Sequence, residues 1–489
     1  MPMPRSFPPS AVPAALPHVR GSHALHWLAC LGLGSLLSLA QAAPDPTPVT
    51  HTLSELVARA RGFDAQWQAQ QADARATASR AEQARAGLLP SVGLQAGVSE
   101  QHSKTNIAPG TTSQPLRNFQ LSAQQPLYRP ANKIAYEQGQ RSLDAAQAQL
   151  AGGEQTLLVR VAQAYFDVLG AQDSLAVVRA QKQAIAEQLA SAQRNFELGT
   201  ATITDAREAQ ARFDLSLAQE IAASNELEVK RLALEQIVGS AGVRPRPLAA
   251  PLTLAPLAPA DAQSWVDLAL AHQPQLHQAQ VALDIARMET RKAEAGHKPT
   301  VDLQAGAGMN RYPEGSITPP VPVPYTGRAA SVGVVMNLPL FAGFAVQNRI
   351  QETLALEDKA RAQLDEARRS VEQNTRTAFL GVQSGQAQVT ALEAALASSQ
   401  SALEANQRGY QVGVRINIDV LNAQSQLYQT RRDLALARYA LLMGQLRLRQ
   451  ATGQLSDADL SAIDALTEQR IAQGPDSSNK RSGSSFLNK

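Results

Sequence analysis

The sequence is almost devoid of cysteine. Cys30 is the only cysteine among 489 residues, and it lies inside an apolar run near the N-terminus. A lipoprotein cysteine would follow such a run, so lipidation of Cys30 is not expected. Once a leader containing Cys30 is removed, disulfides and thiolate chemistry are both excluded.

Aromatic residues are also scarce, at 4% of the chain, although hydrophobic residues make up 44%. Much of the apolar content is alanine. Together with Gln, Leu, Arg and Glu, alanine is typical of long helices that pack closely through small side chains. Composition alone favours the simplest interpretation, an ordinary coiled coil.

The motifs of common enzymes are missing as well. The histidines form no HExxH pair, and His272 and His277, five positions apart, do not share a helical face well. No Gly-rich phosphate loop is present. We therefore expect no enzymatic activity, no metal site and no cofactor.

The charge is too small for a nucleic-acid partner. The net charge of +3 falls to about +1 once Arg5 and Arg20 are removed with the leader, which leaves no basic footprint for nucleic acid.

The N-terminus predicts export. Arg5 and Arg20 precede an apolar run from Trp27 to Leu39, which ends in Ala40-Gln41-Ala42. This pattern is typical of a secretory signal peptide at residues 1–42 with an A-x-A cleavage site. No later stretch approaches the ~18 apolar residues of a membrane helix. The sequence therefore predicts an exported protein that is not an α-helical membrane protein.

The most informative feature that is present is a long internal repeat. Gly199 and Asp205 recur as Gly413 and Asp419, and the ungapped match extends from residues 164–239 to residues 378–453. Solenoid repeats have periods of ~20–50 residues, so a repeat this long duplicates a whole architectural unit.

The repeat divides the mature chain into two halves with the same order of elements. We expect a first structural repeat at residues 43–244, a Pro/Ala linker at 245–261 and a second structural repeat at 262–454. A C-terminal segment, 455–489, follows, and its Ser-rich end is expected to be disordered. The sequence of each half predicts a helix, two strands, a very long helix, a tight turn and a second helix that runs back along the first.

Each half begins with a helix that ends at a proline and leads into a β-hairpin. The helices are expected at residues 52–86, with Thr52 or Ser54 as N-cap, and at 265–295. The hairpins are expected at residues 90–127 and 299–340, with a Pro-rich loop, 310–327, in the second.

The expected strands alternate strictly between apolar and polar positions. In the first strand, Val92, Leu94 and Val98 face one way, and Gly93 and Gln95 face the other. Period-two alternation is the signature of a transmembrane strand with its apolar face toward lipid. A half-buried soluble sheet would alternate similarly. However, the polar faces of all four strands hold Gly, Ser and Gln rather than charge, which favours the membrane.

The strands run into helices of around 70 residues that end near Gly199 and Gly413, each about 100 Å long. The turns, or tips, are expected at residues 198–205 and 412–419. Four membrane strands cannot stand alone, because an open sheet leaves unpaired backbone groups in hydrocarbon. We therefore predict a mixed α/β membrane protein. Three chains of four strands would form a trimeric 12-stranded β-barrel that is continuous with a long α-helical barrel.

With these features, the chain resembles the TolC family of outer-membrane channels over essentially the whole mature length. The resemblance is carried by Leu89-Pro90-Ser91-Val92, by the two Pro-Leu-aromatic steps at 126–128 and 339–341, and by both tips. A structural coiled-coil stalk would not explain the strands. A periplasmic adaptor would have one helical hairpin rather than two.

The resemblance implies an exit duct in the cell outer membrane with a long periplasmic extension. Its implied partners are two further copies of the chain, outer-membrane lipid, a periplasmic membrane-fusion adaptor and an inner-membrane transporter of the RND or ABC type. The cargo would be drugs or secreted proteins. A type I secretion channel dedicated to one protein substrate is the alternative, and the sequence does not decide between them.

The resemblance also implies a gate at the periplasmic entrance. The expected polar links are Tyr410 with Asp205 and Arg415 with Thr204, each worth about 1–3 kcal/mol. The simpler interpretation is that Asp205 and Asp419 only cap helix N-termini, and both can be true.

Asp419 would line the constricted entrance as part of an anionic ring. The family's second carboxylate falls at Asn422 here, whereas Glu208 occupies the corresponding position in the first half. The anionic ring has therefore either moved to the first hairpin or lost half its charge. Gly199 and Gly413 permit tight turns at bare tips, where we expect the adaptor to dock.

Overall fold

The computed structural model describes residues 50–104, 111–248, 257–317, 320–321 and 323–472. The expected signal peptide and the expected disordered end, from residue 477 onward, lie outside the described residues. None of the described helices combines the length and the apolar composition needed to cross a lipid bilayer.

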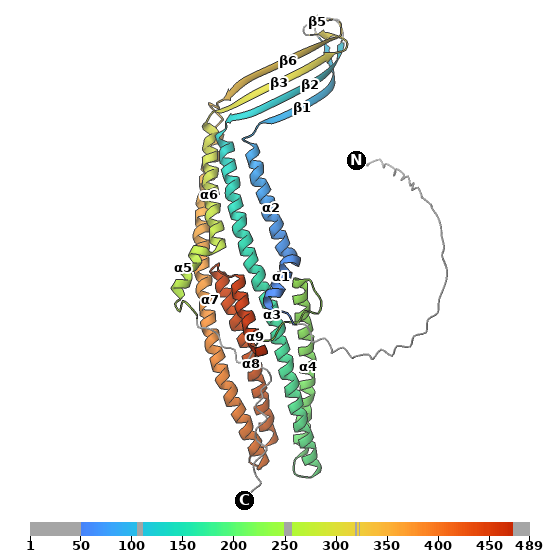
Figure 1. Ribbon diagram of the computed structural model, residues 1–489, viewed down its shortest axis with the longest axis vertical. Coiled ribbons are helices and arrows are strands. Elements are labelled where there is room, and N and C mark those ends of the chain that lie inside the picture. The colour runs from blue at the N-terminus through green and yellow to red at the C-terminus, as the bar shows by residue number, and fades with distance from the viewer. Residues whose placement is uncertain (1–49, 105–110, 249–256, 318–319, 322, 473–489) are drawn as a thin grey trace, which may run out of the picture. The chain divides into compact units, whose positions relative to one another are not determined.

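Four antiparallel strands form one sheet in the order β1-β2-β3-β6 (Figure 1). They are β1 (Ser91–Lys104), β2 (Thr111–Tyr128), β3 (Thr300–Tyr312) and β6 (Tyr325–Asn337). The two hairpins come from the two repeats and join through β2 and β3. The expected four strands per chain are thus confirmed, and each strand is longer than its alternating run. The loop expected at 310–327 also holds two short paired strands, β4 (Ser316–Ile317) and β5 (Pro320–Val321).

The strand register gathers the alternating positions onto two different faces. On one face, Leu94 lies opposite Leu121, followed by Ala307 and Ala330 on the next two strands. On the other face, the corresponding row is Gly93, Ser122, Gly306 and Ser331. We call these the apolar face and the polar face. The sheet therefore has the two-sided character that the alternation predicted.

Two pairs of long helices follow the strands. The first hairpin consists of α3 (Pro130–Glu197) and α4 (Ile203–Val238), and the second of α7 (Ala345–Gln411) and α8 (Asn417–Ala451). The longest helices, α3 and α7, have 68 and 67 residues, or about 100 Å each. Pro130 begins α3 at a position where its missing N–H costs nothing. The predicted helical hairpins are confirmed.

The single helix predicted over residues 52–86 is wrong. The chain forms α1 (Leu53–Phe63) and α2 (Ala65–Ala86) with a break at Asp64. The Asp64 carboxylate accepts the Trp67 N–H at 2.7 Å and pairs with Arg160 at 2.7 Å. A capping side chain thus starts a new helix. The prediction for Thr52 is confirmed, because it forms a capping box with Glu55 at the start of α1.

The second early helix is also divided, into α5 (Ala262–His272) and α6 (Pro274–Glu294), with a short 3-10 turn, Ala295–His297, after it. The break lies at Gln273, which has an extended conformation. Proline disfavours the helical conformation in the residue before it and starts a helix readily. Pro274 therefore explains why the predicted continuous helix over 265–295 is wrong.

Glu289, on α6, forms hydrogen bonds that connect α6 with α3 and α7. Its carboxylate accepts hydrogen bonds from Gln138 on α3 at 3.0 Å, Arg349 on α7 at 2.8 Å and Lys292 on α6 at 3.1 Å. Burial opposes ionisation of Glu289, but these three donors outweigh burial and lower its pKa to about 2.

The C-terminal segment contains a helix that was not predicted, α9 (Asp457–Ala472). The buried Asp464 carboxylate accepts the backbone N–H groups of Leu53 at 2.8 Å and Ser54 at 3.1 Å, at the start of α1. Leu460 and Leu53 belong to the main apolar core, which also receives residues from α3, α4 and α8. The first and the last of the described helices, α1 and α9, thus contribute to the same core.

Candidate functional site

The two tips have nearly the same backbone geometry. Gly199 has φ +72° and Gly413 has φ +75°, a left-handed conformation that glycine adopts without strain. The turns close through backbone hydrogen bonds from Thr200 to Asn195 at 2.8 Å and from Val414 to Gly409 at 2.9 Å. A Cβ at either glycine would meet no atom within 4 Å. Both tips are therefore bare, and conformation rather than space selects glycine there.

Polar contacts join the two helical hairpins just behind the tips. Asn195 on α3 donates to the Tyr410 hydroxyl on α7 at 3.4 Å, and Arg212 on α4 donates to Asn422 on α8 at 3.0 Å. Together with the Asn417 contacts described next, we call these bonds the tip links. Each one crosses from the first repeat to the second, so it must break if the hairpins separate.

Asn417 is the most buried member of the tip links. It begins α8 with only 2% of its surface exposed. Its side chain accepts from the Gln188 amide on α3 and donates to the Asp205 carbonyl on α4 at 3.5 Å. Next to it, Leu421 packs with Ile185 in a small apolar cluster between the same helices.

The structure does not bring the expected gate pairs together within the described part of one chain. Tyr410 meets Asn195 instead of Asp205. Arg415 lies 3.6 Å from Asp419 instead of contacting Thr204, which is exposed.

Asp205 itself acts as a helix cap. Its carboxylate accepts the Thr202 N–H at 3.1 Å, and the Thr202 side chain accepts the Asp205 N–H at 3.3 Å. This capping box begins α4. The Asp205 side chain remains partly exposed, so its carboxylate is still accessible to solvent while it caps α4.

The residues proposed for the anionic ring lie in the first two turns of α4 and α8. Asp419 and Glu208 are half-buried, whereas Asn422 is exposed and accepts from Arg212. Arg415 and Arg212 are therefore cations close to this ring. Among the described residues, no cluster of three or more His, Cys, Asp and Glu side chains lies close enough to hold a metal ion.

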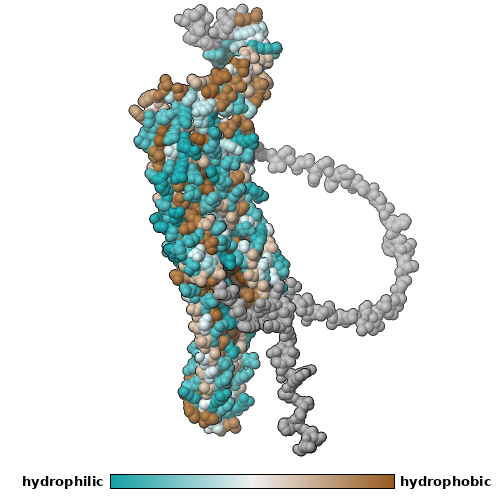
Figure 2. All heavy atoms as spheres, turned by 60° about the vertical axis from the view of Figure 1, so that its left-hand side comes forward, coloured by the Kyte–Doolittle hydropathy of each residue, from teal (hydrophilic) through white to brown (hydrophobic). Residues whose placement is uncertain are grey.

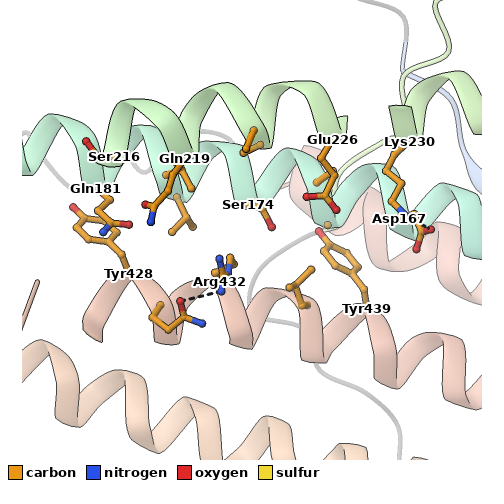
Figure 3. A pocket seen from close by; sticks show the side chains of 18 of the residues that line it. Asp167, Ser174, Gln181, Ser216, Gln219, Glu226, Lys230, Tyr428, Arg432 and Tyr439 are labelled. Carbon is orange, nitrogen blue, oxygen red and sulfur yellow. Dashed lines mark hydrogen bonds and ion pairs between the residues drawn. The ribbon is translucent and has the colours of Figure 1, made fainter. Parts of the chain in front are cut away.

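A polar groove of about 1140 Å³ lies between the hairpins and extends from Arg212 and Asn422 away from the tips (Figure 3). It is lined by α3, α4 and α8 and runs along α3 from Gln163 to Ile185. Lys230 pairs with Asp167 across one end at 3.0 Å. Tyr439 on α8, which also lines the groove, donates to Asp173 on α3 at 2.6 Å. The Lys230–Asp167 pair thus joins the two helices of the first hairpin, whereas the Tyr439–Asp173 bond joins the two hairpins. Arg212 and Asn422, which belong to the tip links, line the same groove.

Asp205, Tyr410 and Asn422 were predicted at the tips, but Asn417 and the side chains that donate to the tip links were not. Gln188, Asn195 and Arg212 are ordinary polar residues in long helices, and only packing reveals them. Asn417 did carry a signal, because the repeat places Asn417 where the first half has Ile203. A polar residue replacing an aliphatic one at the start of a helix points to a specific partner.

The fold and the tips define a class of protein before any comparison is made. A four-stranded sheet with one apolar face, continued by two paired helices of about 100 Å, is the unit of a channel that crosses a membrane and extends far beyond it.

Comparison with known proteins agrees with this class. The model of the family described as "Outer membrane efflux protein" matches residues 56–240 and 265–454, one match for each repeat. The chain therefore belongs to the outer membrane efflux protein family. It is 30% identical to the outer membrane protein TolC of Vibrio cholerae, over 84% of this chain and 93% of the relative. It is 34% identical to the alkaline protease secretion protein AprF of Pseudomonas aeruginosa, over 71% of each chain.

Solved structures show the same fold at lower identity. The outer membrane protein VceC of Vibrio cholerae matches with a TM-score of 0.71 and 21% identity, over 82% of this chain and 96% of VceC. CusC matches with a TM-score of 0.72 and 19% identity, over 85% of this chain and 95% of CusC. The chain is thus an outer-membrane efflux or secretion duct with an elongated helical extension into the periplasm.

Proposed function

We propose that three copies of this chain form the exit duct of a tripartite export system. The observation that carries the proposal is the open sheet. Within the described residues, β1 and β6 each pair with one strand only, so both edges of the four-stranded sheet lack a partner. Unpaired edges are not tolerated in hydrocarbon. Pairing β6 of one chain with β1 of the next, three times, closes a barrel of 12 strands.

The oligomeric state tests this proposal directly. Protein extracted from outer membranes in detergent should have the mass of a trimer by native mass spectrometry, and cysteines introduced on the facing edges of β1 and β6 should cross-link between chains. Cysteines on the central strands β2 and β3 provide the control, because those strands already pair within one chain. A monomeric particle with a closed barrel would contradict the proposal.

The bare tips support docking of a periplasmic adaptor, which would connect the duct to an inner-membrane transporter of the RND or ABC type. Gly199 and Gly413 present exposed backbone without side chains, so a partner can approach closely. The two tips share one geometry, which suits an adaptor that meets each chain twice.

The same region also contains the residues that we propose control the opening and closing of the entrance. In the proposed gate, the tip links hold the two hairpins of one chain together. Arg415 with Thr204, and Tyr410 with Asp205, add links between chains. The partly exposed Asp205 and the exposed Thr204 and Arg415 support this division, because each has a surface available to a neighbour.

The cargo is either small molecules or proteins. Two relatives named for protease secretion favour the second candidate, a dedicated type I secretion channel. They are AprF, at 34% identity, and the proteases secretion protein PrtF of Dickeya chrysanthemi, at 30%. Expression in a host that lacks its own duct separates the two. Restored drug resistance supports general efflux, whereas restored secretion of one co-expressed protein without drug resistance supports the dedicated channel.

A further inference from the structure

Three arginines interrupt the apolar face of the sheet. Arg117 on β2 lies directly opposite Val98 and Arg311, and Arg328 on β6 lies opposite Met309. By strand parity these arginines belong to the same face as Leu94 and Leu121. All three are exposed. We call them the arginine cluster.

The arrangement is unfavourable without an anion. Directly opposed residues on antiparallel strands have Cβ atoms about 5 Å apart, and diagonal neighbours lie about 7–8 Å apart. Arg117 and Arg311 form such a direct pair of like charges, and Arg328 is diagonal to Arg311. Glu100 is the acidic residue near them on this face, and its carboxylate contacts the Ser113 hydroxyl. Within the described residues, none of the three arginines forms an ion pair with an acidic side chain.

The position of the cluster matches the edge of a membrane. Val301, at the start of β3, and Arg311 are ten residues apart, or about 33 Å along the strand. A strand tilt of about 40° reduces this to about 25 Å, the height of the apolar band of an outer-membrane barrel. The opposite border is marked by exposed apolar side chains where strands meet helices, including Leu340 at 90% exposure and Phe341 at 75%. Hydrophobic surface gathers at this junction (Figure 2).

Two members of the cluster are also remote from contacts between chains in the proposed trimer, whereas Arg328 lies on the edge strand β6. Arg117 and Arg311 lie on the central strands β2 and β3, whereas neighbouring chains would meet β1 and β6. The surface around these two arginines therefore faces lipid. An arginine on the lipid face is costly at the membrane midplane but nearly free of cost at the interface.

We propose that Arg117, Arg311 and Arg328 bind the phosphate groups of an anionic lipid in the outer leaflet. Guanidinium groups bind phosphate oxygens in pairs of parallel hydrogen bonds, so one phosphate between the opposed arginines replaces their repulsion by attraction. The apolar face beside the cluster, with Phe119 and Met309 one row closer to the membrane centre, accommodates the acyl chains of the same molecule. The occupant is thus a lipid rather than a free anion.

Native mass spectrometry of the intact oligomer in detergent tests the inference. The probes are phosphatidic acid and phosphatidylcholine with identical acyl chains. Wild-type protein should prefer phosphatidic acid. The variant R117Q/R311Q/R328Q should bind it on the order of 100-fold more weakly, with phosphatidylcholine binding unchanged. The single variant R311Q should lose about fivefold, and it keeps the test valid if the triple variant does not assemble.

The matched control R75Q/R368Q/R369Q removes the same charge from exposed positions on α2 and α7 and should leave lipid binding unchanged. Equal loss in the control, or an unchanged preference in R117Q/R311Q/R328Q, overturns the inference. Full displacement of phosphatidic acid by inorganic phosphate also overturns it, because a free anion would then be the ligand. The inference rests on the proposed outer-membrane trimer. A particle that is not a trimer refutes that function, whereas a trimer without lipid preference refutes only the arginine cluster.

Discussion

Replacing Asn417 with alanine should favour the open state of the entrance. Asn417 is the buried side chain through which the second hairpin contacts both helices of the first, as acceptor from Gln188 and donor to the Asp205 carbonyl. Truncation leaves the Gln188 amide without this partner in a confined space. Loss of a buried hydrogen bond of this kind costs about 1–3 kcal/mol. The bond to Asp205 is long, so we take about 1.4 kcal/mol per chain, a tenfold change in the open-to-closed ratio.

Single-channel recording in planar lipid bilayers measures this change as open probability. The matched control is Ile203→Ala, because the repeat places Ile203 where the second half has Asn417. The Ile203 side chain is 49% exposed, and no tip link depends on it. We expect Asn417→Ala to raise open probability about tenfold or more and Ile203→Ala to have little effect.

The reasoning is refuted if both variants behave like the wild type while Asn417→Ala still assembles in the outer membrane. Asn417 would then be a packing residue at a helix start. A combined Asn417→Ala and Gln188→Ala variant distinguishes the two roles further. Its effect should be smaller than the sum of the single effects, because the two residues share one bond.

Three further outcomes are expected. Substitution of Gly199 and Gly413 by valine forces a β-branched residue into a left-handed turn and should abolish export, measured in cells, while the trimer still reaches the outer membrane. Asp419→Ala should reduce cation preference and block by multivalent cations in planar bilayers, because three-fold symmetry makes one carboxylate into a ring; Glu208→Gln should add to that loss. Because the pKa of Glu289 is lowered to about 2, its stabilising contribution is complete above about pH 4.5 and disappears as the pH falls toward 2. Acid denaturation followed by circular dichroism should therefore show a weaker acid dependence for Glu289→Gln.

For each of these three predictions, a specific result would contradict the reasoning. Normal export with valine at both Gly199 and Gly413 argues against docking at the tips. Unchanged selectivity in Asp419→Ala identifies Asp419 as a helix cap only, and an effect of Asp419→Ala without any effect of Glu208→Gln leaves the ring with one carboxylate per chain. An unchanged acid transition in Glu289→Gln means that Glu289 does not stabilise the junction of the three helices.

The strands and long helices could be predicted because they obey local rules. Alternation places Leu94 and Leu121 on one face whatever the rest of the chain does, since strand side chains alternate by geometry. Gly199 and Gly413 end their helices because the turn needs a left-handed residue. Because the two halves are duplicates, each of these features could be predicted twice, once from each half of the sequence.

The missed features depend on contacts between segments distant in sequence. The break at Asp64 is decided partly by Arg160, which lies on another helix. Pro274, by contrast, was a local signal, and the break before it was predictable from the sequence. The tip links could not be predicted, because Asn195 and Tyr410 meet only when the two repeats pack together.

The bond from Asp464 to the start of α1 has a consequence for how the duct is made. The first helix of the chain is capped by a carboxylate from near its end, so α1 lacks that cap until residue 464 has left the inner membrane. A product that stops after the second repeat would keep both hairpins, both tips and the Thr52–Glu55 capping box, but α1 would lack the two hydrogen bonds to Asp464.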